Sequence, residues 1–257
     1  MTAIGVAEMI PAMAERIAHQ FDPLRIILYG SQARGDAKPW SDVDLLVILP
    51  EVANEWEKRI EIGCELRDFP VTTDIVVATP EEIRRRGDLV GTVLRPALRE
   101  GRVLYEREGD EHEWGCTPVS EDEVAKEVWL WLQFAEDDLS TAELLIGHPE
   151  VAPRQAGFLA QQAAEKALKA IFIFLQVQYP FTHDLEKLRD LLPTGWRVKE
   201  AHPDLKALSA WAVEPRYPNR FLVTRDEARG VVRQARAVQR SVLRDLRAHG
   251  FATEAQL

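Results

Sequence analysis

Three aspartates lie where their carboxylates could bind a divalent cation. Asp42 and Asp44 are two residues apart at the start of an apolar run, and Asp74 lies in a later β-branched run. Side chains two apart in a strand face the same side, so Asp42 and Asp44 would project together. Adjacent carboxylates repel one another, and Mg²⁺ or Mn²⁺ would neutralise them. We therefore expect a two-metal site that orients an attacking oxygen and a triphosphate leaving group.

A Gly-Ser pair before these aspartates could hold phosphate. Gly30 and Ser31 follow an apolar run directly, and ten residues separate Ser31 from Asp42. Glycine lets the backbone approach a phosphate closely, and serine offers a hydroxyl and an amide. Each piece alone is also typical of an ordinary turn or an edge strand. The combination of Gly-Ser, Asp-x-Asp and a third aspartate favours the functional interpretation.

The first half of the chain has the elements needed to position these groups. The pattern predicts strands over 25–29, 42–49, 71–77 and 102–105, with a helix over 53–68. A second helix should begin at Thr79-Pro80-Glu81-Glu82, where Thr79 can cap and Glu82 completes a capping box. Gly101 should end the helix before the last strand. We expect an α/β domain with a small mixed sheet over 1–106.

The second half is predicted to be entirely helical. Residues 107–120 combine dense charge with glycine and proline and indicate a linker. From 121 to 257 apolar residues recur at steps of three and four. The expected helices cover 121–147, 152–177, 184–192 and 204–213, followed by a long helix capped by Thr224 with Glu227. The chain is therefore predicted to be α+β overall, with an all-α bundle in its second half.

Composition limits the class of protein. The 257 residues are 46% hydrophobic and carry a formal net charge of −10, which excludes a generally basic nucleic-acid-binding surface. Cys64 and Cys116 form no CxxC pair, which argues against a disulfide framework or a thiolate zinc site. Without an apolar signal region or a membrane-length apolar run, the expected location is the cytoplasm, with no membrane contact.

A row of arginines marks one face of the last predicted helix. They recur at steps of three and four, away from apolar positions such as Ala228, Val232 and Leu246. The members are Arg225, Arg229, Arg233, Arg236, Arg240, Arg244 and Arg247. Two interpretations stay open: a solvated face paired with acidic helices, or a docking surface for phosphate, nucleotide or RNA. In the second, the candidate polyanion contacts are Arg225, Arg229, Arg233, Arg236 and Arg240.

The segment LYGSQARGDAKPWSDVDLLVIL resembles the signature of minimal nucleotidyltransferases of the DNA-polymerase-β-like superfamily, and the resemblance covers about residues 10–106. It implies transfer of a nucleotidyl group from an NTP to a hydroxyl, with release of pyrophosphate. Asp42, Asp44 and Asp74 would be the catalytic and metal-binding residues, with Asp74 helping to activate the acceptor. The candidate nucleotide-binding residues are Gly30, Ser31, Arg34 and Ser41.

Residues 121–247 resemble a HEPN domain, a helical module often fused to such enzymes. The resemblance rests on AQQAAEKALKAIF (160–172), FTHDLEKL (181–188) and EPRYPN (214–219). It implies a helical bundle that commonly forms a homodimer. The alanines in the first segment recur at helical spacing, so they are expected to form core or dimer seam. They are Ala160, Ala163, Ala164, Ala167 and Ala170.

Ribonuclease activity, which many HEPN domains have, is not expected here. The required Arg-His spacing occurs at Arg107/His112, Arg197/His202 and Arg244/His249, but these pairs fall in the linker, a loop and the chain end. His183 is expected to belong to a helix N-terminus, where Thr182 can cap.

The sequence thus predicts a Mg²⁺-dependent nucleotidyltransferase that moves an NMP, expected to be AMP from ATP, to a protein, a small molecule or an RNA. The HEPN half would supply dimerisation and acceptor or nucleotide binding. A different class stays open: a non-catalytic regulatory module of toxin–antitoxin type whose HEPN half binds nucleotide or RNA. The intact carboxylates favour the enzyme, and the arginines favour binding.

Overall fold

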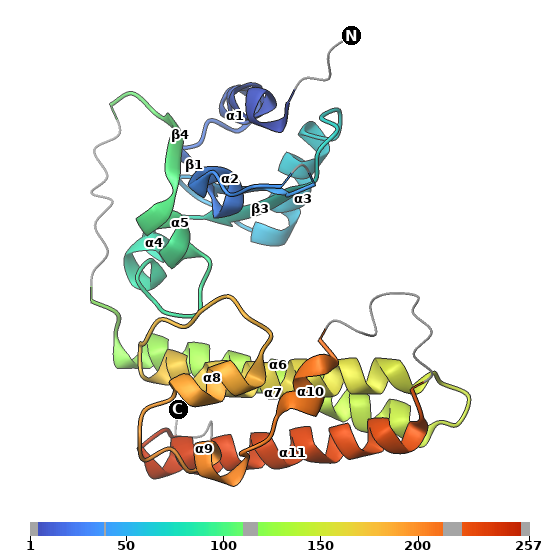
Figure 1. The fold of residues 1–257 in the computed structure, drawn as a ribbon. Helices are drawn as coiled ribbons and strands as arrows, with labels where there is room; N and C mark the ends of the chain where they lie inside the picture. The colour runs from blue at the N-terminus through green and yellow to red at the C-terminus, as the bar shows by residue number, and fades with distance from the viewer. Residues whose placement is uncertain (1–4, 39, 110–117, 213–222, 253–257) are drawn as a thin grey trace. The chain divides into compact units, whose positions relative to one another are not determined.

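The computed structural model describes residues 5–38, 40–109, 118–212 and 223–252. The chain divides into two compact units, Met1–Ser120 and Glu121–Leu257. The first unit contains the sheet and the second is helical (Figure 1).

The first unit is built on a four-stranded mixed sheet in the order β3-β2-β1-β4. β1 (Arg25–Tyr29) pairs antiparallel with β2 (Val43–Ile48) and with β4 (Arg102–Glu106), while β2 pairs parallel with β3 (Thr73–Ala78). All four strands expected from the sequence are present, with ends shifted by no more than two residues. One shift matters: Asp42 lies just before β2, not inside it.

Helices cover both faces of the sheet, which explains why β1 and β2 are apolar almost throughout. The helices are α1 (Val6–Phe21), α2 (Gly30–Arg34), α3 (Glu55–Glu65), α4 (Pro80–Arg86) and α5 (Leu94–Glu100). Ile17 of α1 and Ile62 of α3 belong to one core with Leu45. Ile83 of α4 and Ala97 of α5 belong to the other core with Leu46. Neighbouring residues of β2 thus enter opposite cores.

Local sequence signals set several helix ends. The Thr79 hydroxyl accepts a hydrogen bond from the Glu82 amide at 3.2 Å, and Gly101 follows the end of α5. The prediction that Glu82 completes a capping box is wrong, because its side chain is hydrogen-bonded to Arg86 at 3.3 Å instead. The two residues are one helical turn apart, so the ion pair competes with the cap.

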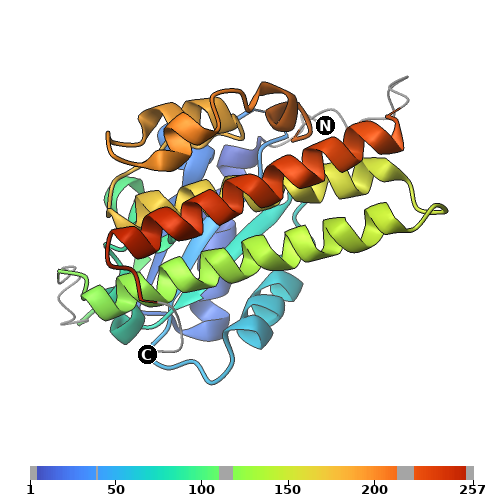
Figure 2. The ribbon, with the colours of Figure 1, turned by 90° about the horizontal axis from the view of Figure 1, so that it is seen from below.

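The second unit is a helical bundle around α7 (Pro153–Phe174), which packs against α6 (Glu121–Gly147) and α11 (Arg225–Ala248). Figure 2 shows these three long helices side by side. The expected alanine positions of α7 are all fully buried inside this unit. Small side chains there let the flanking helices approach closely. These alanines therefore form core.

Shorter helices complete the bundle: α8 (Leu185–Leu191), α9 (Arg197–Ala201) and α10 (Lys206–Ala210). The sequence did not predict α9. Thr224 and Glu227 form the predicted capping box of α11. The cap of α8 is Asp184 instead of Thr182; the Thr182 hydroxyl accepts from the Asp184 amide at 3.1 Å. The EPRYPN motif (214–219) lies outside the described residues.

Within the described ranges, every helix is too short or too polar to cross a lipid bilayer.

Candidate active site

The candidate site begins where β1 passes into α2, at Gly30. This residue has a φ of +68°, a left-handed conformation that favours glycine. A Cβ at this position would lie 2.1 Å from Oδ2 of Asp44. The Gly30 backbone is therefore packed directly against the Asp44 carboxylate, which any larger side chain would displace.

Asp44 and Asp74 are direct partners in the parallel pairing of β2 with β3. Burial raises the pKa of Asp44 from the ordinary 3.8 to about 6, and the negative charges of Asp74 and Asp42 contribute, against the opposing charge of Arg34. Asp42 and Asp74 are exposed. The three aspartates singled out from the sequence thus act on one another electrostatically at one end of the sheet.

These carboxylates are a suitable donor set for Mg²⁺, which prefers oxygen ligands. The pKa of Asp44 is raised first by burial and then by repulsion from Asp74 and Asp42, and a bound cation would relieve that repulsion. In the described part of the chain, however, no three carboxylate, histidine or cysteine groups are arranged to hold a metal ion. The assignment of the aspartates as metal ligands therefore stays a prediction.

The pKa of Asp44 predicts a pH-dependent stability. Its folded-state pKa lies above its unfolded-state value, so the free energy of unfolding falls as pH rises from about 4 to about 6. We expect Asp44→Asn to raise the Tm of the metal-free protein above pH 6. The corresponding gain in the free energy of unfolding is roughly 1 kcal/mol once solvent screening is allowed for. The gain should vanish toward pH 4.

Thermal unfolding at several pH values in the presence of a chelator tests this expectation. Asp68→Asn, at an exposed position of the same unit, controls for the loss of one negative charge from an acidic protein. A gain at pH 4 as large as the gain at pH 8 would contradict the prediction.

The other predicted nucleotide contacts surround Gly30 and Asp44 less tightly. Ser31 is half-buried in α2. Arg34 ends α2 and pairs with Asp36 at 3.4 Å, while its charge also lowers the pKa of Asp44. The Ser41 hydroxyl accepts a hydrogen bond from the Lys38 amide at 2.9 Å and so stabilises the turn before β2. Their roles toward nucleotide stay predictions.

Two residues that sequence reasoning missed face the aspartates. Tyr29 pairs with Asp44 across β1 and β2, and its pKa is raised by burial and by the charges of Asp74 and Asp44. Arg59 of α3 lies 3.6 Å from Asp74. The charge-rich sequence of α3 gives no signal for this pair, because it depends on how α3 packs beside β3.

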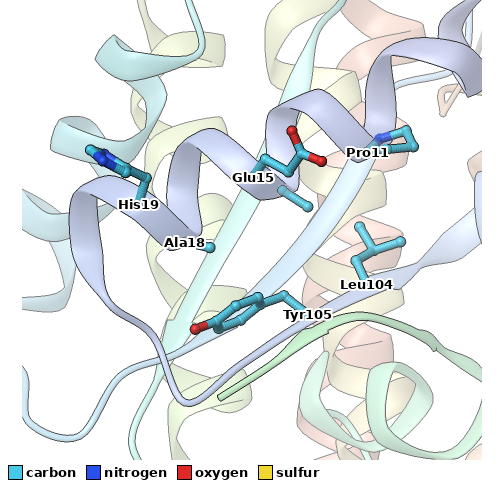
Figure 3. A pocket seen from close by; sticks show the side chains of 7 residues that line it. Pro11, Glu15, Ala18, His19, Leu104 and Tyr105 are labelled. Atoms are coloured by element: carbon cyan, nitrogen blue, oxygen red, sulfur yellow. The ribbon is translucent and has the colours of Figure 1, made fainter. Parts of the chain in front are cut away.

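A separate groove lies at the opposite edge of the sheet, between α1 and β4. It has a volume of about 420 Å³, and Figure 3 shows its lining, with Glu15 and His19 on the helix and Leu104 and Tyr105 on the strand. None of the residues predicted for the active site lines it.

Two of the seven arginines on α11 are occupied within the bundle. Arg225 donates hydrogen bonds to the carbonyl oxygen of Ile146 in the last turn of α6 and to two carbonyl oxygens in the connection from α6 to α7. Arg236 pairs with Glu136 at 2.6 Å and Glu143 at 2.7 Å on α6. Arg229 pairs with Asp226 at 3.0 Å. Of these three arginines, only Arg236 pairs with an acidic helix, as the paired-face interpretation expects, and the docking role of the whole row stays a prediction.

Four arginines remain exposed and, among the described residues, have no ion-pair partner; we call them the arginine surface. They are Arg233, Arg240, Arg244 and Arg247. At 100° per residue they lie within about 60° of one another and extend over about 21 Å of α11. The polar face of α11 is thus divided into a paired row and an unpaired row.

His183, itself exposed, contacts buried polar residues of the bundle. Its Nδ1 lies 3.0 Å from Glu165, which also binds Lys169 at 2.7 Å and Gln161 at 2.9 Å. Burial alone would raise the pKa of Glu165, but these partners lower it below its usual range. This cluster ties α7 to the start of α8, a role that the sequence did not reveal.

The histidines of the described Arg-His pairs make local contacts. His202 Nε2 lies 2.9 Å from the Ser241 hydroxyl, and His249 stacks on Trp196 with ring centroids 4.2 Å apart. His112 lies outside the described residues.

Comparison with known proteins identifies both halves of the chain. Residues 10–104 match the family model "Nucleotidyltransferase domain", and residues 128–246 match the model "HEPN domain". The protein is therefore a nucleotidyltransferase domain followed by a HEPN domain. Both resemblances inferred from the sequence are confirmed, as is the α+β fold class.

Two solved structures that match this chain are at most 28% identical to it. The protein TT1696 from Thermus thermophilus is 28% identical over 46% of this chain and 98% of its own, with a TM-score of 0.40. Spectinomycin adenyltransferase AAD(9) from Enterococcus faecialis, solved with ATP and spectinomycin, is 12% identical over 90% of this chain and 97% of its own, with a TM-score of 0.45. No curated protein matches the sequence. The assignment rests on the two domain matches.

Proposed function

We propose that this protein is a Mg²⁺-dependent nucleotidyltransferase that moves an NMP, AMP from ATP in the first instance, to an acceptor hydroxyl. The observation that carries the proposal is the direct pairing of Asp44 with Asp74, next to the close approach of Gly30 to the Asp44 carboxylate. The nucleotidyltransferase domain match supports this general kind of reaction.

In the proposed reaction, the acceptor oxygen attacks the α-phosphorus of the NTP. The hydroxyl proton passes to Asp74, the new oxygen–phosphorus bond forms, and the bond to the bridging oxygen breaks. Pyrophosphate leaves with that electron pair. Asp42 and Asp44 would hold Mg²⁺, which supplies positive charge beside the triphosphate when bound. The amides of Gly30 and Ser31 would bind the β and γ phosphates of the NTP.

Three acceptor classes stay open: a protein hydroxyl, a small molecule or an RNA end. The HEPN domain would supply acceptor or nucleotide binding and a homodimer interface. Leu130, Phe134 and Leu144 support the dimer, because these exposed apolar residues lie within about 80° of one another on α6. Light scattering on the purified protein would measure this association.

Transfer can be tested with NTPs labelled at two positions. The protein is incubated with Mg²⁺, cell lysate and each of the four NTPs, labelled at the α- or the γ-phosphate, and the labelled product is identified. NMP transfer should label a product from the α position only. Label from the γ position, or no label from any NTP, would contradict the proposal. Asp44→Asn is the matched control.

A second function, binding of a polyanion such as RNA by the HEPN domain, is favoured by the arginine surface. Arginine forks bind phosphate bidentately, and these side chains have no ion-pair partner among the described residues. In a chain of net charge −10, four arginines on one helix face create a local positive field. This candidate needs no catalytic carboxylate and could operate beside the transferase.

The triple change Arg233→Gln, Arg240→Gln and Arg244→Gln is expected to weaken RNA binding. The slope of log affinity against log salt should fall by about 2, because each single-strand phosphate contact contributes about 0.7. The Tm should change little, since these side chains are exposed. Binding would be measured by fluorescence anisotropy with a single-stranded RNA.

A matched control removes three positive charges elsewhere on the HEPN domain, by changing the exposed Arg154, Lys187 and Lys206 to Gln. Equal weakening by both triple variants would indicate a non-specific charge effect and rule out the arginine surface as the docking site.

A further inference from the structure

A groove outside the predicted nucleotide site opens between α3 and the edge strand β3. It has a volume of about 230 Å³ and shares one residue, Asp74, with the candidate catalytic carboxylates. The lining comes from one face of α3 and one end of β3: Trp56, Arg59, Ile60, Gly63, Thr73, Asp74 and Ile75. Any molecule held in this groove is therefore within reach of Asp74.

The α3 wall of the groove exposes large apolar side chains. Trp56 is 68% exposed and Ile60 is 45% exposed, whereas Ile62 on the same helix is buried in the core. Neither Trp56 nor Ile60 belongs to the two hydrophobic cores that cover the sheet. Packing of the fold therefore does not explain why these two side chains are apolar. An exposed indole beside a polar site is a platform on which a planar or cyclic ligand can stack.

Arg59 gives the groove a positive charge, and its ion pair with Asp74 can be replaced by one with a ligand. Its guanidinium lies 3.6 Å from Asp74, and both side chains are about half exposed. A pair of this kind contributes little, because solvent screens it. A ligand with a negatively charged group could therefore take Arg59 from Asp74 and leave that carboxylate available to the ligand's hydroxyl.

Size limits the ligand further. Pockets that enclose drug-sized ligands have volumes of about 300–1,000 Å³, so this groove suits a single ring unit. Gly63 adds space, since a Cβ there would meet no atom closer than 3.9 Å.

From these features we propose that the α3–β3 groove binds the acceptor, and that the acceptor is a small molecule with a hydroxyl-bearing ring unit and one negatively charged group. The ring lies on Trp56, the anionic group pairs with Arg59, and the hydroxyl reaches Asp74. The proposal rests on the nucleotidyl transfer proposed above: the hydroxyl loses its proton to Asp74 as it bonds to the α-phosphorus, and pyrophosphate leaves.

Direct binding tests the groove independently of catalysis. Glucose 6-phosphate and glucose serve as a probe pair, since each has a single ring and they differ only in the anionic group. Binding to the full chain is measured by calorimetry, with Mg²⁺ and a non-hydrolysable ATP analogue saturating the nucleotide site. We expect glucose 6-phosphate, the monophosphate, to bind about tenfold more tightly than glucose, and Arg59→Gln to abolish that difference.

Variants at the stacking platform complete the test. Trp56→Ala should weaken both probes about tenfold or more, and Trp56→Phe should restore most of the affinity. Arg67→Gln, an equivalent charge change just beyond α3 at a side chain 80% exposed, should change neither. Unchanged melting temperatures would confirm that the variants fold.

The proposal is overturned if the wild-type protein shows no saturable binding of the monophosphate at millimolar concentration. It is also overturned if binding survives both Trp56→Ala and Arg59→Gln. These outcomes differ from failure of the transferase, which would appear as absence of label from α-labelled NTPs whatever the probes do.

Discussion

Asp44→Asn and Asp42→Asn are each expected to lower the rate of nucleotidyl transfer by about 1,000-fold or more, or about 4 kcal/mol of transition-state stabilisation. An amide keeps the shape of the side chain but removes the negative charge that would hold Mg²⁺. Asp44 should be the more sensitive, because its carboxylate is packed against Gly30 and opposite Asp74, whereas Asp42 is exposed. Transfer of label from α-labelled ATP measures the rate.

Folding and metal binding are measured on the same variants to separate chemistry from stability. Mg²⁺ with ATP should raise the Tm of the wild-type protein, and this increase should be much smaller in Asp44→Asn. Asp68→Asn removes a charge from a side chain that is 73% exposed and whose ion pair with Arg16 is screened by solvent, so this variant should behave as wild type. Turnover at the wild-type level in either variant would show that the metal-site assignment is wrong.

Most of the fold follows from local patterns in the sequence. β1 and β2 are short apolar runs flanked by polar residues, and the capping box at Thr224 marks the first turn of α11. Such signals act over a few residues, so the sequence alone shows them. The sequence analysis placed no helix over α1, α2 or α9; α2 and α9 have only five residues each, too few to give a periodic pattern, whereas the 16 residues of α1 were simply missed.

The sequence identified the aspartates of the candidate site but not the contacts that these residues make. Asp44 and Asp74 could be singled out by type and spacing, but their direct pairing depends on the parallel register of β2 with β3. Arg59 is contributed to Asp74 by α3, a separate element. Helix periodicity placed Arg236 on the same face as Arg240, yet only the packing of α6 shows that Arg236 is paired. Tertiary contacts decide such roles.

Asp74→Ala is expected to separate chemistry from nucleotide binding. Loss of a positioned proton acceptor lowers a rate by about 100- to 10,000-fold, so kcat should fall within this range. The affinity for NTP should stay within a few-fold of wild type, because the proposed role of Asp74 concerns the acceptor oxygen and the transition state. Single-turnover transfer and equilibrium ATP binding measure the two quantities separately.

The neighbours of Asp74 supply the controls for this variant. Asp74 is exposed, so its truncation should leave the Tm nearly unchanged, and removing its charge lowers the pKa of Asp44 toward the ordinary value. Nucleotide binding beside Asp42 and Asp44 should therefore not suffer. Arg59→Gln removes the same ion pair but keeps the carboxylate, and it should retain far more of kcat than Asp74→Ala. A collapse of ATP affinity with a near-normal residual rate would instead make Asp74 a phosphate-site or structural residue.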